Sequence, residues 1–243
     1  MITGGDIASY IFVVIHLVIW KGNFLNEEIQ PKHFFIVNEF MKEVKNIYVM
    51  EANRNLRDDL LFLETVYKRE EEKKEIIENL NELGINVKDI IVDDSSDKPK
   101  FYFVRIINGK EYKLDLFDES EGLLSLVYLI PLINVFLAVG STFIIDELDA
   151  HLHPKILQEI IKRFQSKSNT YSQLIFTSHD ITNMDNDIFR RDEVWFVVKE
   201  EDYSSNIYSL TDIVNYKGEK VRKDAKFSKQ YLEGRYGALP FIK

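Results

Sequence analysis

The amino-acid sequence predicts an α/β fold built on a parallel sheet, and the C-terminal half carries the observations that predict it. Short apolar runs rich in β-branched and aromatic residues alternate there with longer stretches of helical character, and the connections are short. Such alternation is typical of βαβ units, whose strands run parallel beneath covering helices. We expect strands at 142–146, 173–177, 194–198 and 206–210, and helices at 121–138 and 154–166.

The N-terminal half is expected to form a helical lobe with one β-hairpin. Asn108-Gly109 tolerates the positive φ angles of a tight turn and lies between two alternating runs. Residues 7–20 are apolar without a clear period, so helix and strand both remain open there. We expect helices at 31–49 and 55–83, the latter ended by Gly84, and strands at 87–92, 101–107 and 111–116. The chain then divides into an N-terminal lobe at 1–118 and a core at 119–243.

Composition and charge exclude several classes of protein. The 243 residues are 45% hydrophobic and 29% charged, enough for a substantial core. Because the chain has no cysteine, a disulfide scaffold and a thiolate metal site are excluded, and a reducing cytoplasm fits. The net charge of −9 argues against a surface devoted to nucleic acid. Ser125, Pro131 and Asn134 interrupt the apolar stretch 123–139, which favours a buried helix over a membrane span.

Two adjacent carboxylates follow the first buried strand of the C-terminal half. Asp146 and Glu147 come directly after Phe143-Ile-Ile145, so Asp146 is expected to be partly buried. Burial of an unpaired carboxylate is unfavourable, and a metal ion or another cation would offset that cost. Because open α/β sheets bind ligands beyond the carboxyl ends of their strands, the pair suits a hydrated Mg²⁺ and an activated water. The simpler interpretation is that these acids only begin a loop.

A histidine occupies the matching position after the next buried strand. One βαβ crossover separates Leu174–Thr177 from the first strand, so His179 is expected at the same edge of the sheet. An imidazole placed there can hydrogen-bond a phosphate oxygen or the attacking water. His179 therefore strengthens the functional interpretation of the acid pair.

The segment Ser120-Glu121-Gly122 opens the apolar helix 121–138. Ser120 is well placed as the N-cap, and capping alone is the simpler interpretation. The same geometry points unpaired amides and the positive end of the helix dipole outward, where they can hold a phosphate. In that case Gly122 would keep the approach open for the ligand.

These motifs, in this order, resemble those of the ABC-type ATPase superfamily, and the SMC, RecF and OLD-like branch more than the transporters. Glu119–Gly122 looks like the signature motif, Asp146–Pro154 like Walker B followed by the D-loop, and Phe176–Asp180 like the H-loop. Arg190–Phe196 and Tyr231–Pro240 resemble segments of bacterial AAA family ATPases linked to abortive infection and phage defence.

The resemblance implies a P-loop NTPase core that binds ATP with Mg²⁺ and forms a head-to-tail homodimer. Asp146 would hold Mg²⁺ through water, Glu147 would orient or deprotonate the attacking water, and His179 would be the switch histidine. Residues near the start of the helix would contact the γ-phosphate of a nucleotide held by the partner subunit. The nucleotide-binding set that follows from the resemblance is Ser120, Gly122 and Asp149.

One part of this design is missing from the sequence. The phosphate-binding loop G-x-x-x-x-G-K-[ST] occurs nowhere, and the only Gly-Lys pair, Gly109-Lys110, lies in the predicted hairpin. In this superfamily the loop lies N-terminal to the motifs seen here. We therefore expect the C-terminal part of a longer ATPase, inactive until another segment or chain supplies the loop. Leu123 and His153 also depart from the residues usual in the signature motif and D-loop.

Several alternatives remain open. The chain could be a non-catalytic module that dimerises or docks an effector nuclease or toxin. Asp146, Glu147 and Asp149 could form the metal site of a nuclease, and His151 and His153 together with Asp149 could bind Zn²⁺. The segment from residue 216 onward has eight Lys/Arg against three Asp/Glu and could contact nucleic acid.

Overall fold

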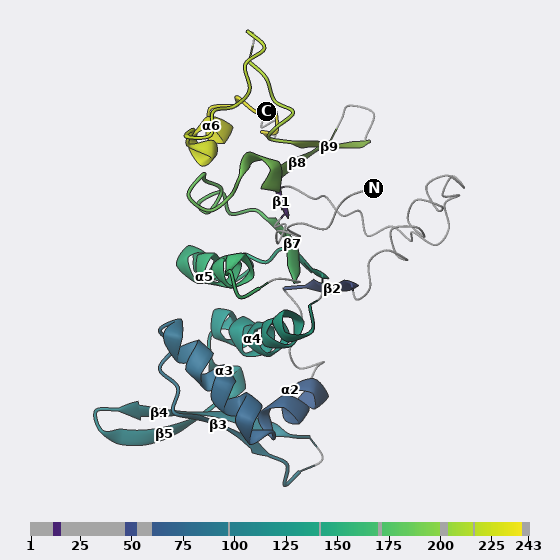
Figure 1. Ribbon diagram of the computed structural model, residues 1–243. Coiled ribbons are helices and arrows are strands. Elements are labelled where there is room, and N and C mark those ends of the chain that lie inside the picture. Colours follow the sequence, from purple (N-terminus) through teal and green to yellow (C-terminus); the bar gives the residue numbers. More distant parts are fainter. Residues whose placement is uncertain are drawn as a thin grey trace.

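A six-stranded sheet forms the centre of the computed structural model (Figure 1). The structure describes residues 12–15, 47–52, 60–96, 98–140, 142–169, 172–199, 204–215 and 217–239. The strands are β1 (Phe12–Ile15), β2 (Ile47–Glu51), β6 (Thr142–Asp146), β7 (Gln173–Ser178), β8 (Val194–Lys199) and β9 (Ser205–Ser209). Their order is β2-β6-β7-β1-β8-β9, and every pairing is parallel except that of β8 with β9. The predicted α/β fold with a parallel sheet is confirmed.

Two helices of the core are those predicted from the sequence. Helix α4 (Glu121–Val139) has Ser120 as its N-cap and ends at Gly140, whose φ of 72° is a conformation that glycine adopts freely. Helix α5 (Pro154–Gln165) begins with proline in its first turn and buries one stripe at helical spacing. The short elements η3 (Arg191–Glu193) and α6 (Phe227–Leu232) complete the C-terminal part.

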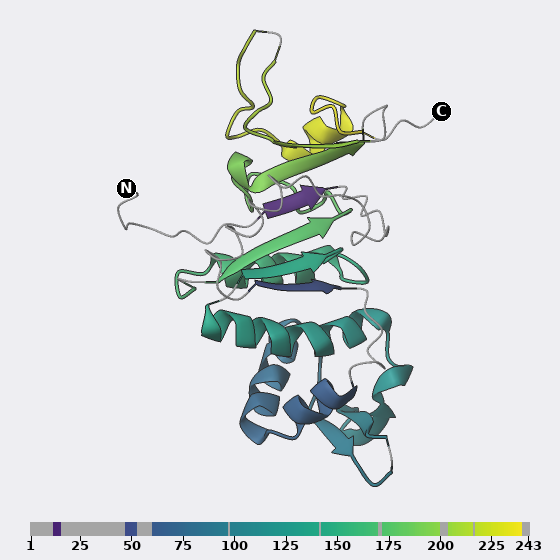
Figure 2. The same cartoon turned by 90° about the vertical axis from the view of Figure 1, so that its right-hand side faces the viewer.

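Helix α4 is mostly apolar, and it is covered on two sides. It lies between the sheet and an insertion that precedes it in the chain (Figure 2). Toward the sheet, Phe136 packs against Phe143 of β6 with ring centroids 4.1 Å apart. Among the described residues α4 is the one helix long and apolar enough to cross a membrane, but its burial is that of a core helix.

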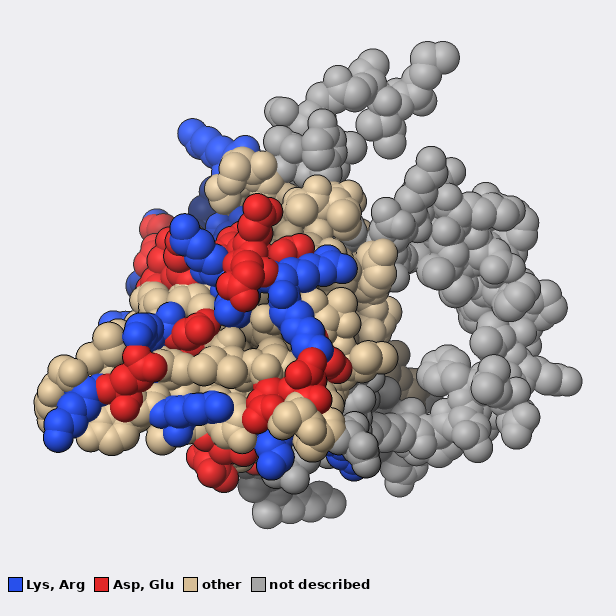
Figure 3. Space-filling model, turned by 90° about the horizontal axis from the view of Figure 1, so that it is seen from below, with Lys and Arg blue, Asp and Glu red and all other residues tan. Residues whose placement is uncertain are grey.

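The insertion consists of two helices and an antiparallel sheet. Its elements are α2 (Leu60–Tyr67), α3 (Glu70–Glu82), β3 (Asp89–Asp93), β4 (Lys100–Ile107), β5 (Lys110–Asp115) and the 3-10 helix η2 (Leu116–Asp118). The predicted hairpin is confirmed, and Asn108 and Gly109 have φ angles of 52° and 76°. On the face seen in Figure 3, acidic and basic side chains are interspersed, so the insertion presents no patch of one sign there.

A buried hydrogen bond joins the insertion to α4 at a proline. Pro131 has no N–H, so the Val127 carbonyl four residues earlier loses its usual helical donor. The Tyr67 hydroxyl of α2 donates to that carbonyl at 2.8 Å. Burial raises the pKa of Tyr67 far above its ordinary value, which keeps the hydroxyl protonated as a donor. The sequence places the proline and the insertion supplies the missing donor.

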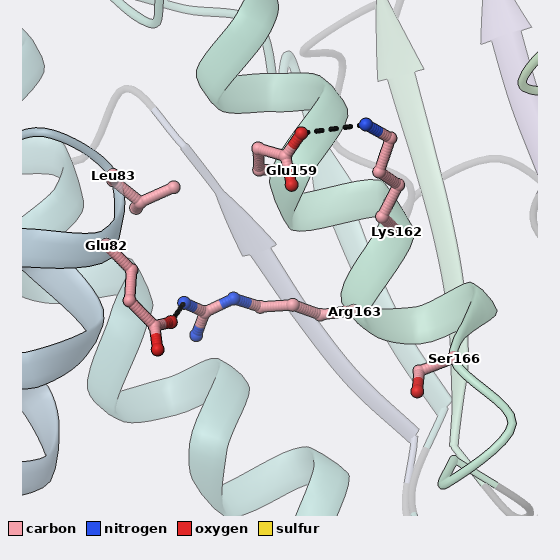
Figure 4. A pocket seen from close by; sticks show the side chains of 6 residues that line it. All are labelled: Glu82, Leu83, Glu159, Lys162, Arg163 and Ser166. Carbon is pink, nitrogen blue, oxygen red and sulfur yellow. Dashed lines mark hydrogen bonds and ion pairs between the residues drawn. The ribbon is translucent and has the colours of Figure 1, made fainter.

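A second contact ties the insertion to α5. A hollow of about 330 Å³ lies where the end of α3 meets α5 (Figure 4). Arg163 of α5 reaches across it to Glu82 at 3.5 Å, while Lys162 pairs with Glu159 on its own helix at 2.7 Å. The buried apolar cluster runs without a break from the insertion into α4 and the sheet. The domain boundary at residues 118 and 119 stays a prediction.

Three expectations in the N-terminal half need revision or lie beyond the structure. The single helix expected at 55–83 is wrong, because the chain is extended at Arg69 (φ −91°, ψ 109°) and a new helix starts after it. Glu70, Glu71 and Glu72 occupy its first turn, where acidic side chains stabilise a helix start through the dipole. Of the helix expected at 31–49, residues 47–49 belong to β2 instead, and 31–46 lie outside the described residues. Within 7–20, only β1 is described.

Candidate functional site

The acid pair lies at the carboxyl edge of the sheet, held by a threonine of the neighbouring strand. Parallel pairing of β6 with β7 brings Asp146 beside Thr177. The Thr177 hydroxyl donates to Asp146 Oδ1 at 2.5 Å and accepts the Glu147 backbone N–H at 2.7 Å. Thr177 was not predicted as a site residue, and its signal in the sequence is weak: a hydroxyl near the end of an apolar strand. It fixes both acids relative to β7.

Glu147 and His179 face each other across the two strand ends. His179 Nε2 lies 3.6 Å from Glu147 Oε1, and the two side chains are 53% and 47% exposed. The backbone of Glu147 has a φ of 53°, which non-glycine residues seldom adopt. Such strain persists where the surrounding structure imposes it, and it often marks functional sites. The predicted pair is therefore brought together and left open to a ligand.

Asp149 joins the D-loop to the H-loop. Its Oδ1 and Oδ2 each lie 3.2 Å from the backbone N–H of His179, and Oδ2 also accepts from the N–H of Asp180 at 3.1 Å. The carboxylate thus holds the loop that carries His179. Whether Asp149 also contacts a nucleotide stays a prediction.

The start of α4 is packed against the D-loop. Ser120 Oγ caps the helix by accepting from the Leu123 N–H at 3.4 Å. A Cβ atom built on Gly122 would lie 2.5 Å from the carbonyl oxygen of His151. His151 Nδ1 also lies 3.0 Å from a carboxylate oxygen of Glu121. Gly122 is required here because two backbones approach closely, a reason that the sequence alone did not give.

The histidines of the D-loop have structural partners. His153 Nδ1 accepts the Lys155 N–H at 3.2 Å and so caps α5, whereas His151 faces Glu121 of α4. Within the part of the chain that the structure describes, no three His, Asp or Glu side chains are grouped as metal ligands. That arrangement supports neither the zinc alternative nor a three-carboxylate nuclease site.

Asp146 nevertheless suits the magnesium ion that the predicted chemistry implies. Mg²⁺ is held in nucleotide sites by one or two carboxylates together with water and phosphate oxygens, so no protein cage is needed. Asp146 is partly exposed at the strand end, and the one contact described for its carboxylate is made through Oδ1. The residues present therefore fit a water-mediated Mg²⁺.

Strand β1 adjoins the H-loop strand. It pairs in parallel with β7, so that Ile15 lies opposite Ser178 at the carboxyl edge. Ligands of open α/β sheets bind beyond this edge. The residues that follow Ile15 contain no G-x-x-x-x-G-K-[ST] sequence, and 16–46 lie outside the described residues.

The C-terminal basic segment packs its aromatic side chains inward. Tyr231 stacks on Phe196 of β8 at 5.7 Å with rings nearly parallel, and burial raises the pKa of Tyr236 to about 12. Several of its cations have acidic partners. The ion pairs are Arg222–Asp224, Lys226–Asp185, Lys229–Glu233 and Arg235–Glu233. This packing favours a structural role over nucleic-acid contact.

Comparison with known proteins places these motifs in a family. The sequence model of a family described as "AAA domain, putative AbiEii toxin, Type IV TA system" matches residues 14–185. None of the curated proteins matches. Among solved structures, an SMC head bound to the C-winged helix domain of ScpA is similar, with a TM-score of 0.40 and 17% identity over 58% of this chain. The chain spans 43% of the length of that SMC head chain.

Proposed function

Because the chain belongs to the family of AAA domains described as putative AbiEii toxins of a type IV toxin–antitoxin system, we propose that it supplies the hydrolytic half of an ABC-type ATP site. The membership confirms the predicted resemblance to AAA family ATPases of the abortive-infection kind. One observation carries the proposal: Thr177 fixes Asp146 and Glu147, with His179 at 3.6 Å from Glu147. A general base, a polar partner and a carboxylate for the cation thus meet at one edge of the sheet.

Each residue of this edge has a role in ATP hydrolysis. Glu147 orients the attacking water and accepts its proton, and His179 hydrogen-bonds the water or a γ-phosphate oxygen. Asp146 would hold Mg²⁺ through water, and the bound ion would stabilise negative charge on the phosphates. Asp149 keeps His179 in place through the backbone of its loop. Proton transfer of this kind typically contributes about 10²- to 10⁴-fold to a rate.

The start of α4 serves a second subunit in this proposal. Ser120 and the first amides of the helix contact the γ-phosphate of a nucleotide held by the partner in a head-to-tail homodimer. The phosphate-binding loop comes from another segment or chain, because the sequence contains none. Residues 119–243 form the ATPase core and 1–118 the remaining lobe, and a cytoplasmic role in phage defence fits the family and the absence of cysteine.

The test is a substitution in the chain produced together with its flanking coding sequence. Glu147→Gln keeps the size of the side chain and removes the base, so ATP turnover should fall by at least about 100-fold while ATP binding is retained. Glu159→Gln is the matched control, because this exposed carboxylate of α5 lies outside the site. ATP turnover by Glu147→Gln at the rate of the control would overturn the assignment.

A second candidate is a non-catalytic module that dimerises or docks an effector nuclease or toxin. The absence of a phosphate-binding loop from the sequence favours it. It predicts no ATP turnover in the protein with its flanking sequence and no effect of Glu147→Gln on self-association. An ATP-dependent dimer that accumulates in Glu147→Gln would instead support the ATPase.

A further inference from the structure

A partly buried ion pair links the inserted sheet to the turn before α4. Arg105 of β4 places a guanidinium nitrogen 3.1 Å from Glu119 Oε1, and the two side chains are only 27% and 15% exposed. Arg105 Nε and Glu119 Oε1 are themselves buried, and within the described residues the contact at Oε1 is an ion pair without hydrogen-bond geometry. Removal of one partner from such a pair is unfavourable, because the other charge is then left with little water to solvate it.

Glu119 belongs to the segment that carries Ser120. We call Glu119–Gly122 the signature turn. Its first two residues are extended, with φ and ψ of −78° and 168° at Glu119 and −65° and 149° at Ser120. They form a short link between η2 and α4, so the Glu119 side chain is attached directly next to the N-cap of the helix.

The signature turn is held from the opposite side by the D-loop. The His151 carbonyl oxygen lies against Gly122, and His151 Nδ1 is paired with Glu121. A hollow of about 320 Å³ separates this contact from Arg105, and Leu123 and Ile156 contribute its apolar lining. The turn is therefore contacted by one side chain from β4 and by the loop that follows β6, and the hollow lies between these two contacts.

We propose that Arg105 is a positioning residue for the signature turn. The proposal rests on the proposed function, in which Ser120 and the first amides of α4 contact a γ-phosphate. By holding Glu119, Arg105 sets the direction in which these groups face. The inserted sheet thereby acts on the ATP site without touching the nucleotide, and a displacement of β4 would be transmitted to the start of α4.

Hydrogen–deuterium exchange measures the positioning directly, in the chain with its flanking sequence. Arg105→Ala should raise the exchange rate of the amides at 121–124 by roughly tenfold, whereas Arg105→Lys, which keeps the cation, should stay within about threefold of wild type. Lys88→Ala is the matched control, because it removes an exposed ion pair with Glu111 on the same sheet. Unchanged exchange at 121–124 in Arg105→Ala would overturn the proposal. A rise in the exchange rate at 121–124 that is as large in Arg105→Lys as in Arg105→Ala would also overturn the proposal.

ATP turnover by the same variants separates positioning from fold maintenance. Arg105→Ala should lower kcat by roughly tenfold with little change in KM for ATP, because in the proposed function the nucleotide is bound by the phosphate-binding loop that another segment or chain supplies. If Glu147→Gln abolishes turnover, then a raised exchange rate at 121–124 with an unchanged kcat in Arg105→Ala would reject a role of Arg105 in the reaction. If Glu147→Gln turns over normally, the proposed function fails, and the exchange result alone decides whether Arg105 positions the turn.

Discussion

Replacing Tyr67 with phenylalanine removes the donor that Pro131 makes necessary. The ring remains and only the hydroxyl is lost, so the apolar packing of this fully buried side chain is unchanged. The Val127 carbonyl, which accepts from Tyr67 at 2.8 Å, would then be buried without its bond. An unsatisfied buried carbonyl costs about 1–3 kcal/mol. We expect Tyr67→Phe to lower the free energy of unfolding by that amount.

A double-mutant cycle tests this reasoning by urea denaturation. Pro131→Ala restores the amide N–H four residues after Val127, so the helix itself can then satisfy the carbonyl. In that background the cost of Tyr67→Phe should fall by roughly 1 kcal/mol or more, and this difference is the coupling energy of the two residues. Tyr112→Phe, at an exposed position of β5, should change stability by less than about 0.5 kcal/mol. An equal cost of Tyr67→Phe in both backgrounds would refute the explanation.

Three further perturbations can be measured in the same denaturation assay. Thr177→Val removes the hydroxyl that binds Asp146 and should lower the free energy of unfolding by about 1–3 kcal/mol. Thr177→Ser keeps the hydroxyl and should therefore retain most of the wild-type stability. Gly122→Ala forces a Cβ against the His151 carbonyl and should lower the free energy of unfolding by about 1–3 kcal/mol. A variant as stable as wild type would show that the D-loop can shift to make room for the methyl group. Burial raises the pKa of Glu193 above 4.5, so the folded state holds this proton more tightly and stability should fall as pH rises from 4.5 through the folded pKa. Glu193→Gln should flatten that decline, and an unchanged pH profile would contradict it.

The sequence allowed accurate prediction where local pattern determines structure. The strand at 142–146 agrees with β6 and the expected hairpin turn lies at Asn108-Gly109, because apolar runs and positive-φ dipeptides act over a few residues. The same logic placed Asp146 and His179 at one edge, since parallel strands with a short crossover share their carboxyl ends. The break at Arg69 was missed because continuous helical spacing outweighed the local preference of three acids for a helix start.

Contacts between distant residues could not be predicted in this way. Ile47 is part of a strand only because it pairs with β6, about a hundred positions further along the chain. Arg105 and Glu119 look like ordinary surface charges until the hairpin folds back on the start of α4. The sequence signal of Thr177 is only a hydroxyl near the end of an apolar strand, and its role becomes clear when β6 lies beside it.

The carboxylate of Asp149 has a consequence for how this edge of the sheet could evolve. It accepts backbone amides from the loop after β7, so two loops that are separate in the sequence share one anchor. Insertions or deletions in either loop would displace that anchor and misplace the imidazole of His179. These two loops are therefore expected to keep their lengths together, because a change in one would have to be matched by a change in the other.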